Sequence, residues 1–196
     1  MSAKAPPPPT PSSSPLTWAR VARRIRVPLS FLAAIAYVWL ARPTLASLIA
    51  GTIVIVPGLA MRALASGHVQ KDKQLTTCGP YAYTRNPLYL GSLLMAAGFA
   101  IGARSWWIVA IMLVMFVVIY VPVIAGEERY LRQTFANYDD YARHVPRMLL
   151  RLTPYGGHSQ QSEFSSARYW KHREYQASVG CAVMLAILIA KLLITS

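Results

Sequence analysis

The apolar residues of this 196-residue chain are gathered into long blocks rather than spread evenly. Five blocks follow one another, at residues 27–41, 44–65, 87–103, 105–125 and 177–194. None shows the alternation of apolar and polar residues that is typical of half-buried strands, and only helices or closed barrels satisfy their backbone in lipid. The pattern therefore predicts an all-α membrane bundle of about five transmembrane helices, of which the second and fourth reach the length a bilayer requires.

Composition and charge agree with a membrane protein. Hydrophobic residues make up 55% of the chain, charged residues 14%, and the mean hydropathy is +0.35. If the N-terminus is cytoplasmic and the helices alternate, all but three of the 20 lysines and arginines fall on the cytoplasmic side. The exceptions are Arg42, Arg104 and Lys191. This positive-inside bias explains the net charge of +13 without nucleic acid, which we do not expect as a partner.

The ends of the chain and its cysteines refine this organisation. Residues 1–19, rich in Pro and Ser, predict a disordered cytoplasmic tail rather than a secretory signal, and residues 20–196 form the membrane domain. The proposed topology places Cys78 in the reducing cytoplasm, so no disulfide with Cys181 is expected. The histidines lack metal-ligand spacing with cysteines or acids, and we expect no metal.

A short connection at residues 102–104 makes the third and fourth helices an antiparallel hairpin. Asn86, before the third helix, then lies at the same depth as Glu127 and Glu128, at the end of the fourth. Asn86 is expected to cap the third helix with Pro87 in its first turn, which leaves free NH groups that favour an anion beside Arg85. An ordinary capped helix with an arginine reaching the headgroups explains the same residues equally well.

The two glutamates are predicted to supply the opposite charge. Arg132 lies four residues after Glu128 and is expected to pair with it, which leaves Glu127 to face inward. An anion site and a cation site with Tyr81, Tyr83 and Tyr89 between them suit a zwitterion that carries an aromatic ring. S-adenosylmethionine (SAM) fits this description, as do phospholipid headgroups and nucleotides. No Gly-rich phosphate loop is present to favour a nucleotide bound in the usual soluble way.

The order of motifs resembles that of the isoprenylcysteine carboxyl methyltransferases, membrane enzymes that are themselves similar to the phospholipid N-methyltransferases. The matching positions are Gly79, Tyr81, the run 85–91 (RNPLYLG), the run 127–131 (EERYL), Tyr138, Tyr141 and the run 145–147 (VPR). The resemblance covers residues 71–147, the predicted cofactor core. It departs from the family at Asn86, where a His is usual, and at Val123, where eukaryotic relatives carry an arginine for the prenylcysteine carboxylate.

The resemblance implies SAM as cofactor and a cytoplasmic pocket that binds it. Together with Arg85, the residues expected to contact SAM are Gln74, Leu75, Thr76, Tyr81, Asn86, Pro87, Leu88, Tyr89 and Glu127. The implied function is methyl transfer to a small or lipid-like amphipathic acceptor, with a prenylcysteine-like carboxylate as one candidate and membrane lipids as partners. Glu128, Tyr141 and His144 are candidate general bases, and nothing in the sequence selects among them.

Three alternatives stay open at this point. A phospholipid N-methyltransferase shares the motifs. A sterol-type reductase would have a similar helical architecture and bind NADPH at the same membrane edge. A scaffold or sensor without activity would bind neither cofactor. Gly91, Gly98 and Gly102 lie near one face of the third predicted helix. This face suits either close helix packing or the approach of a lipid tail.

Overall fold

The computed structural model describes residues 18–69, 74–156 and 164–195, and every regular element in these ranges is helical. Its elements are α1 (Trp18–Leu40), α2 (Leu45–His68), the 3₁₀ turn η1 (Gly79–Ala82), α3 (Pro87–Ala103), α4 (Trp106–Met115), the π-helical turn η2 (Phe116–Tyr120), α5 (Val121–Thr134), α6 (Tyr138–His144), α7 (Ser166–Lys171) and α8 (Tyr175–Thr195). Because α1 begins at Trp18, the last two residues of the predicted tail are helical. Residues 1–17 of that tail lie outside the described residues.

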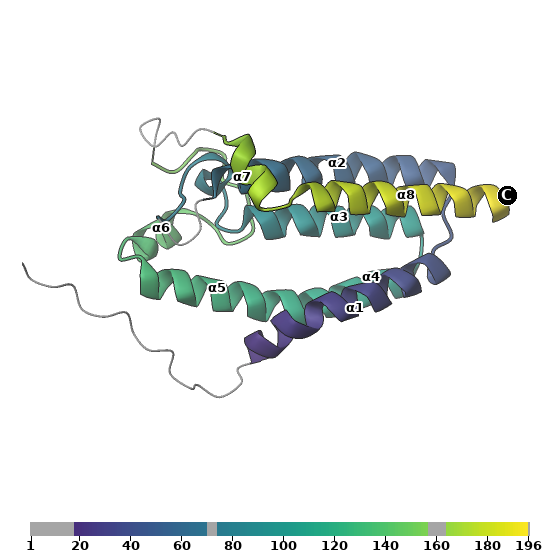
Figure 1. The fold of residues 1–196 in the computed structure, drawn as a ribbon, viewed down its shortest axis with the longest axis horizontal. Helices are drawn as coiled ribbons and strands as arrows, with labels where there is room; N and C mark the ends of the chain where they lie inside the picture. Colours follow the sequence, from purple (N-terminus) through teal and green to yellow (C-terminus); the bar gives the residue numbers. More distant parts are fainter. Residues whose placement is uncertain (1–17, 70–73, 157–163, 196) are drawn as a thin grey trace, which may run out of the picture.

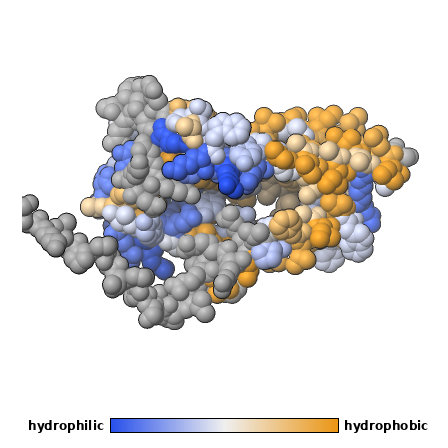
Figure 2. Space-filling model, in the orientation of Figure 1, coloured by the Kyte–Doolittle hydropathy of each residue, from blue (hydrophilic) through white to orange (hydrophobic). Residues whose placement is uncertain are grey.

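Three helices are long and apolar enough to cross a membrane: α2, the continuous helix Trp106–Thr134 and α8. The segments Pro28–Leu40 of α1 and Pro87–Ala103 of α3 are shorter apolar helices. Large apolar side chains such as Ile53, Trp106 and Leu193 are exposed on these helices, and hydrophobic residues cover much of one half of the molecule (Figure 2). The prediction of an all-helical, polytopic membrane protein is confirmed.

The helices form two groups, with α2, α3 and α8 on one side and α1 with α4 and α5 on the other (Figure 1). The contact between α2 and α3 is made through glycines. A Cβ atom on Gly58 would lie 2.7 Å from the carbonyl oxygen of Gly91, and Gly51 faces Gly98 and Gly102 in the same manner. Gly91, Gly98 and Gly102 thus serve close helix packing, the commoner use of such glycines.

Hydrogen bonds at one end of the bundle, here called the turn end, tie α1, α2 and the α3–α4 connection together. The NH of Arg42 donates to the carbonyl of Ala103 at 2.8 Å, and the hydroxyl of Ser47 donates to that of Gly102 at 3.0 Å. Arg104 makes the turn with a left-handed backbone, φ 51°. The antiparallel hairpin places the start of α3 and the glutamates of α5 together at the other end, here called the pocket end.

Candidate functional site

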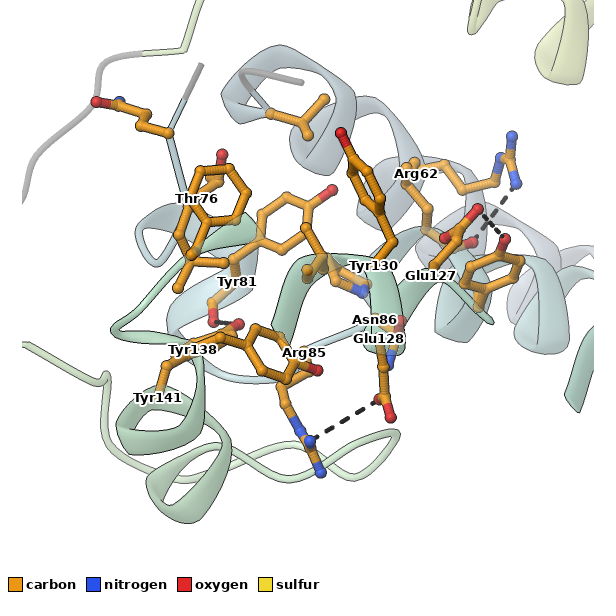
Figure 3. Close-up of a pocket in the computed structure, with 18 of the residues that line it drawn as sticks. Arg62, Thr76, Tyr81, Arg85, Asn86, Glu127, Glu128, Tyr130, Tyr138 and Tyr141 are labelled. Atoms are coloured by element: carbon orange, nitrogen blue, oxygen red, sulfur yellow. Dashed lines mark hydrogen bonds and ion pairs between the residues drawn. The ribbon is translucent and has the colours of Figure 1, made fainter. Parts of the chain in front are cut away.

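A cavity of about 530 Å³ opens at the pocket end, among the loop 74–86, the start of α3 and helices α5 and α6 (Figure 3). All ten residues expected to bind the cofactor line it: Gln74, Leu75, Thr76, Tyr81, Arg85, Asn86, Pro87, Leu88, Tyr89 and Glu127. Gln74 and Glu127, which are 53 positions apart in the sequence, thus line the same cavity. The cavity lies within the range of volumes typical of small-molecule sites.

The loop that carries Tyr81 and Arg85 is held by a segment about 60 residues later in the chain. The hydroxyl of Tyr141 donates to the carbonyl of Tyr81 at 2.7 Å. The NH of Arg85 donates to the carbonyl of Pro146 at 2.9 Å, and the NH groups of Arg151 and Tyr155 bond the carbonyls of Tyr83 and Ala82. Buried Tyr138, Tyr141 and Val145 form an apolar cluster beneath this contact, against which Leu75 packs. Residues 141–155 therefore hold the loop of residues 81–85 in position.

Glu128 is the centre of a buried charge network. Its carboxylate accepts hydrogen bonds from the Arg147 guanidinium and from the amide nitrogen of Asn86 at 3.0 Å, and Arg85 Nη1 lies 3.9 Å away. The expected pairing of Glu128 with Arg132 is wrong. Arg132 instead bonds Asp139 at 2.7 Å and lies over the ring of Tyr138. The cation that pairs with Glu128 is Arg147, which lies on a different segment of the fold. Helical spacing alone does not predict such a partner.

The role expected for the Asn86 side chain also needs correction. Asn86 occupies the N-cap position of α3, with Pro87 in the first turn, yet its side chain makes no capping hydrogen bond. Its Nδ2 donates both to Glu128 Oε1 and to the carbonyl of Arg147, at 3.0 and 3.1 Å. The carboxamide thus joins α3 to α5 and to the segment after α6, instead of satisfying the free NH groups at the start of α3.

Glu127 and Arg85 are two further charged residues of the cavity wall. Glu127 accepts a hydrogen bond from the Tyr89 hydroxyl at 2.9 Å and forms no ion pair among the described residues. Arg85 faces Glu128, which Arg147 already neutralises, and Arg85 Nε is buried without a hydrogen-bond partner in the described structure. Figure 3 shows Arg85 and Glu127 at separate parts of the wall. Arg85 thus shares the single negative charge of Glu128 with Arg147, and Glu127 has no ion-pair partner among the described residues.

The three candidate bases have different surroundings. Burial raises the pKa of the Tyr141 hydroxyl well above its usual range, and this hydroxyl already donates to Tyr81. His144 is exposed, contacts Asp140, and is not among the residues that line the cavity. Glu128 lines the cavity but is held by Arg147 and Asn86. Burial, followed by the nearby carboxylates of Glu127 and Glu174, raises the pKa of Tyr81 as well, so Tyr81 and Tyr141 are neutral at physiological pH.

Several lining residues were not predicted from the sequence. Arg62 on α2 pairs with Glu174, which precedes α8, at 2.7 Å, and both lie in the cavity wall with Ser92. The signal for Arg62 was its position as a cation inside an apolar span, a rare arrangement that is commonly functional. Glu174 lies beyond the motifs and carries no such signal. Tyr120, Tyr130 and Tyr138 complete the aromatic lining.

A second cavity, of about 710 Å³ and mainly apolar, lies among α1, α3, α4, η2 and α8. Its wall includes Met95, Phe99, Met112 and Met184. Tyr89, Ser92 and Tyr120 line both cavities, so the polar pocket and the apolar cavity adjoin at these three residues. Within the described ranges, no group of three His, Cys, Asp or Glu residues is placed to hold a metal ion.

Comparison with known proteins agrees with the motif order. Residues 44–138 match the family model described as phospholipid methyltransferase. The cobalt-zinc-cadmium resistance protein CzcN of Cupriavidus metallidurans is 36% identical over 90 residues, 46% of this chain and 42% of that protein. The nickel-cobalt-cadmium resistance protein NccN of Alcaligenes xylosoxydans xylosoxydans is 34% identical over 84 residues, 43% of this chain and 39% of that protein. The chain thus matches about two fifths of these curated relatives, and no solved structure matches it.

Proposed function

We propose that this chain is a membrane methyltransferase that uses SAM and acts on an amphipathic, lipid-like acceptor. The observation that carries the proposal is the charge balance of the polar pocket. Glu174 offsets Arg62, while Arg85 and Arg147 share the single charge of Glu128, which leaves one positive charge on that side and Glu127 to meet a ligand. A molecule with one carboxylate and one ammonium complements these two groups, and the amino-acid part of SAM has both.

The chemistry of the lining residues fits the rest of SAM. Arg85, with its unpartnered Nε, would hold the carboxylate, since guanidinium groups bind carboxylates well. Glu127 and the Tyr89 hydroxyl would hold the ammonium. The ring faces of tyrosines such as Tyr81 and Tyr130 would attract a sulfonium and stack on an adenine. When bound, SAM supplies an electrophilic methyl group, and the protein's part is to position the two reactants and to exclude water.

The acceptor is proposed to reach this pocket from the membrane. The apolar cavity suits an acyl or prenyl chain, and its junction with the polar pocket at Tyr89, Ser92 and Tyr120 would place the polar head of such a molecule next to the cofactor site. The match of residues 44–138 to phospholipid methyltransferases favours a phospholipid amine as a second candidate acceptor beside a prenylcysteine-like carboxylate. Val123, buried in α5, supplies no cation for that carboxylate.

Cofactor binding tests the proposal directly. Purified protein in detergent should bind S-adenosylhomocysteine with saturable heat release in calorimetry, and NADPH should show none. Glu127→Gln should weaken this affinity by about tenfold or more, because it removes a charge-assisted hydrogen bond. Saturable NADPH binding without S-adenosylhomocysteine binding would instead support the reductase alternative.

The acceptor requires a separate experiment. Incubating the protein with methyl-labelled SAM and a total lipid extract, followed by chromatography of the products, identifies which class of lipid becomes labelled. Label in a phosphatidylethanolamine derivative supports the N-methyltransferase, and a base-labile ester supports carboxyl methylation. No label in any lipid or small-molecule fraction, together with no S-adenosylhomocysteine binding, contradicts the proposed function.

A further inference from the structure

Arg62 and Glu174 form an ion pair that joins α2 to the start of α8. Arg62 donates from Nε and Nη2 to Glu174 Oε2, at 3.1 and 2.7 Å, and its Nη1 bonds the hydroxyl of Ser92 on α3. The two charged side chains are only 23% and 13% exposed. Breaking such a partly buried pair leaves an uncompensated charge, so the pair strongly favours the arrangement in which both partners meet.

Packing of α8 is concentrated in its second half, where Leu188 is buried in an apolar cluster that Met184 and Leu192 also contact. In the first half Cys181 is buried, while Val179 and Val183 are exposed. At the turn end, Lys191 Nζ donates to the carbonyl groups of Val38 and Trp39. The first half of α8 is therefore less packed than the second, and the ion pair of Glu174 lies at its start.

The less packed first half of α8 is also a wall of the apolar cavity. Ala177, Gly180, Cys181 and Met184 of α8 line that cavity. Ala177 lies three positions after Glu174, so the ion pair adjoins the part of α8 nearest to the polar pocket. Ser92, the third member of the network, lines both cavities. The position of Glu174 thus sets the position of the wall that closes the apolar cavity beside the cofactor site.

We propose that Arg62 and Glu174 are positioning residues for the acceptor: their ion pair holds the pocket end of α8 in place, and α8 is the wall that moves when an apolar chain enters the cavity. The acceptor part of this inference rests on the proposed function. The mechanical part, control of α8 by the pair, does not. Releasing the pair frees the end of α8 near Ala177, while the contact of Lys191 keeps the other end attached.

Spin-label distances test the mechanical part. In a Cys78→Ser, Cys181→Ser background, labels at Val117→Cys on η2 and Val179→Cys on α8 occupy exposed positions on two elements whose other residues line the cavity. Glu174→Gln should broaden and lengthen the pulsed-EPR distance distribution, and Glu174→Asp, which keeps the charge, should leave it near that of the parent. A second label pair, Ile53→Cys with Val117→Cys, does not involve α8 and should be unchanged.

A matched variant tests whether the loss of a different ion pair has the same effect on α8 as the loss of the Arg62–Glu174 pair. Asp139→Asn removes the negative charge from the ion pair with Arg132, which has the same 2.7 Å length but exposed partners, and should leave the Val117–Val179 distribution unchanged. An unchanged distribution in Glu174→Gln overturns the proposal. A change in both label pairs also overturns it, because that result indicates general loosening of the bundle.

Kinetic measurements test the proposed role of the ion pair in positioning the acceptor. With labelled SAM and a titrated total lipid extract, Glu174→Gln should shift the half-saturating lipid concentration by about tenfold, the effect expected for the loss of a charged hydrogen bond. The half-saturating SAM concentration should change far less, and a comparable shift in it would overturn the acceptor role. If the parent shows neither methyl transfer nor S-adenosylhomocysteine binding, the proposed function fails, whereas the spin-label result still decides the control of α8.

Discussion

Glu127 and Glu128 are neighbours in the chain with opposite surroundings. Glu128 is buried and contacts Arg147, Arg85 and Asn86, whereas Glu127 is exposed to the pocket and contacts Tyr89. Consecutive helical residues point about 100° apart, so one can face the protein interior while the next faces the pocket. We therefore expect the two carboxylates to have separate roles, Glu128 in stability and Glu127 in the ligand binding proposed above.

Exchanging each glutamate for glutamine should separate these roles. Glu128→Gln is expected to lower the free energy of unfolding by about 1.5–3 kcal/mol, because it removes hydrogen bonds to a charged, buried group. Glu127→Gln should leave that free energy nearly unchanged and weaken S-adenosylhomocysteine binding instead. Thermal unfolding in detergent and calorimetry measure the two effects, and equal destabilisation by both variants would contradict the assignment.

Asn86 offers a second test at this scale. Asn86→Ala should lower the free energy of unfolding by about 1–3 kcal/mol, since Glu128 and the carbonyl of Arg147 each lose a donor. Asn137 is the matched control, because it is also an N-cap residue without a side-chain capping bond and it is exposed. Asn137→Ala should have little effect on thermal unfolding. A similar loss in both variants would mean that the inter-helix bonds of Asn86 contribute nothing to stability.

The residues that line the pocket were easier to predict from the sequence than the ion-pair partners of those residues. All ten expected cofactor residues line the cavity, and seven of them, from Tyr81 to Tyr89 and Glu127, belong to motifs that can be read locally in the sequence. The partner of Glu128 was predicted wrongly because the rule of four-residue spacing applies to isolated helices. Here Arg147, after α6, reaches Glu128, and Arg132 turns to Asp139. Long-range ion pairs of this kind depend on loop paths that motif spacing does not encode.

At the scale of elements, the glycine contact of α2 and α3 determines how closely the two helices approach. Gly58→Ala should destabilise the protein by about 1–3 kcal/mol, because the added methyl group meets the backbone of Gly91 and the side chain of Met95. Gly180→Ala is the matched control in α8, where an added Cβ meets no atom within 4 Å. Thermal unfolding in detergent should distinguish the two variants. Equal melting temperatures would show that α2 and α3 separate without cost.

The five long helices followed from the hydrophobic pattern, with differences at their ends. The first begins at Trp18, before the apolar block that starts at residue 27, and the fourth, expected to end at Glu127 and Glu128, continues to Thr134. The residues after Glu128 are mostly polar, so their helical continuation had no hydropathy signal. The π-helical turn at Phe116–Tyr120 was also not predicted, although Pro122, which cannot donate a backbone hydrogen bond, lies just after it.

At the scale of the whole molecule, the positive-inside distribution predicts that the pocket end faces the cytoplasm. Single cysteines in a Cys78→Ser, Cys181→Ser background test this orientation. Leu152→Cys, at a fully exposed position of the pocket end, should react with a membrane-impermeant maleimide only after the cells are permeabilised. Trp106→Cys, at the turn end, should react in intact cells. The reverse pattern would place the cofactor site outside the cytoplasm.

The hydrogen bonds from residues 146–155 to residues 82–85 have a consequence for biosynthesis. The part of the chain that matches phospholipid methyltransferases ends at residue 138, before Pro146, Arg151 and Tyr155 supply these bonds. A nascent chain that has emerged only to residue 138 thus carries every expected cofactor residue without the backbone partners that hold Tyr83 and Arg85 in place. We expect the ligand-binding shape to be acquired late in translation, after the second and third apolar helices have already entered the membrane.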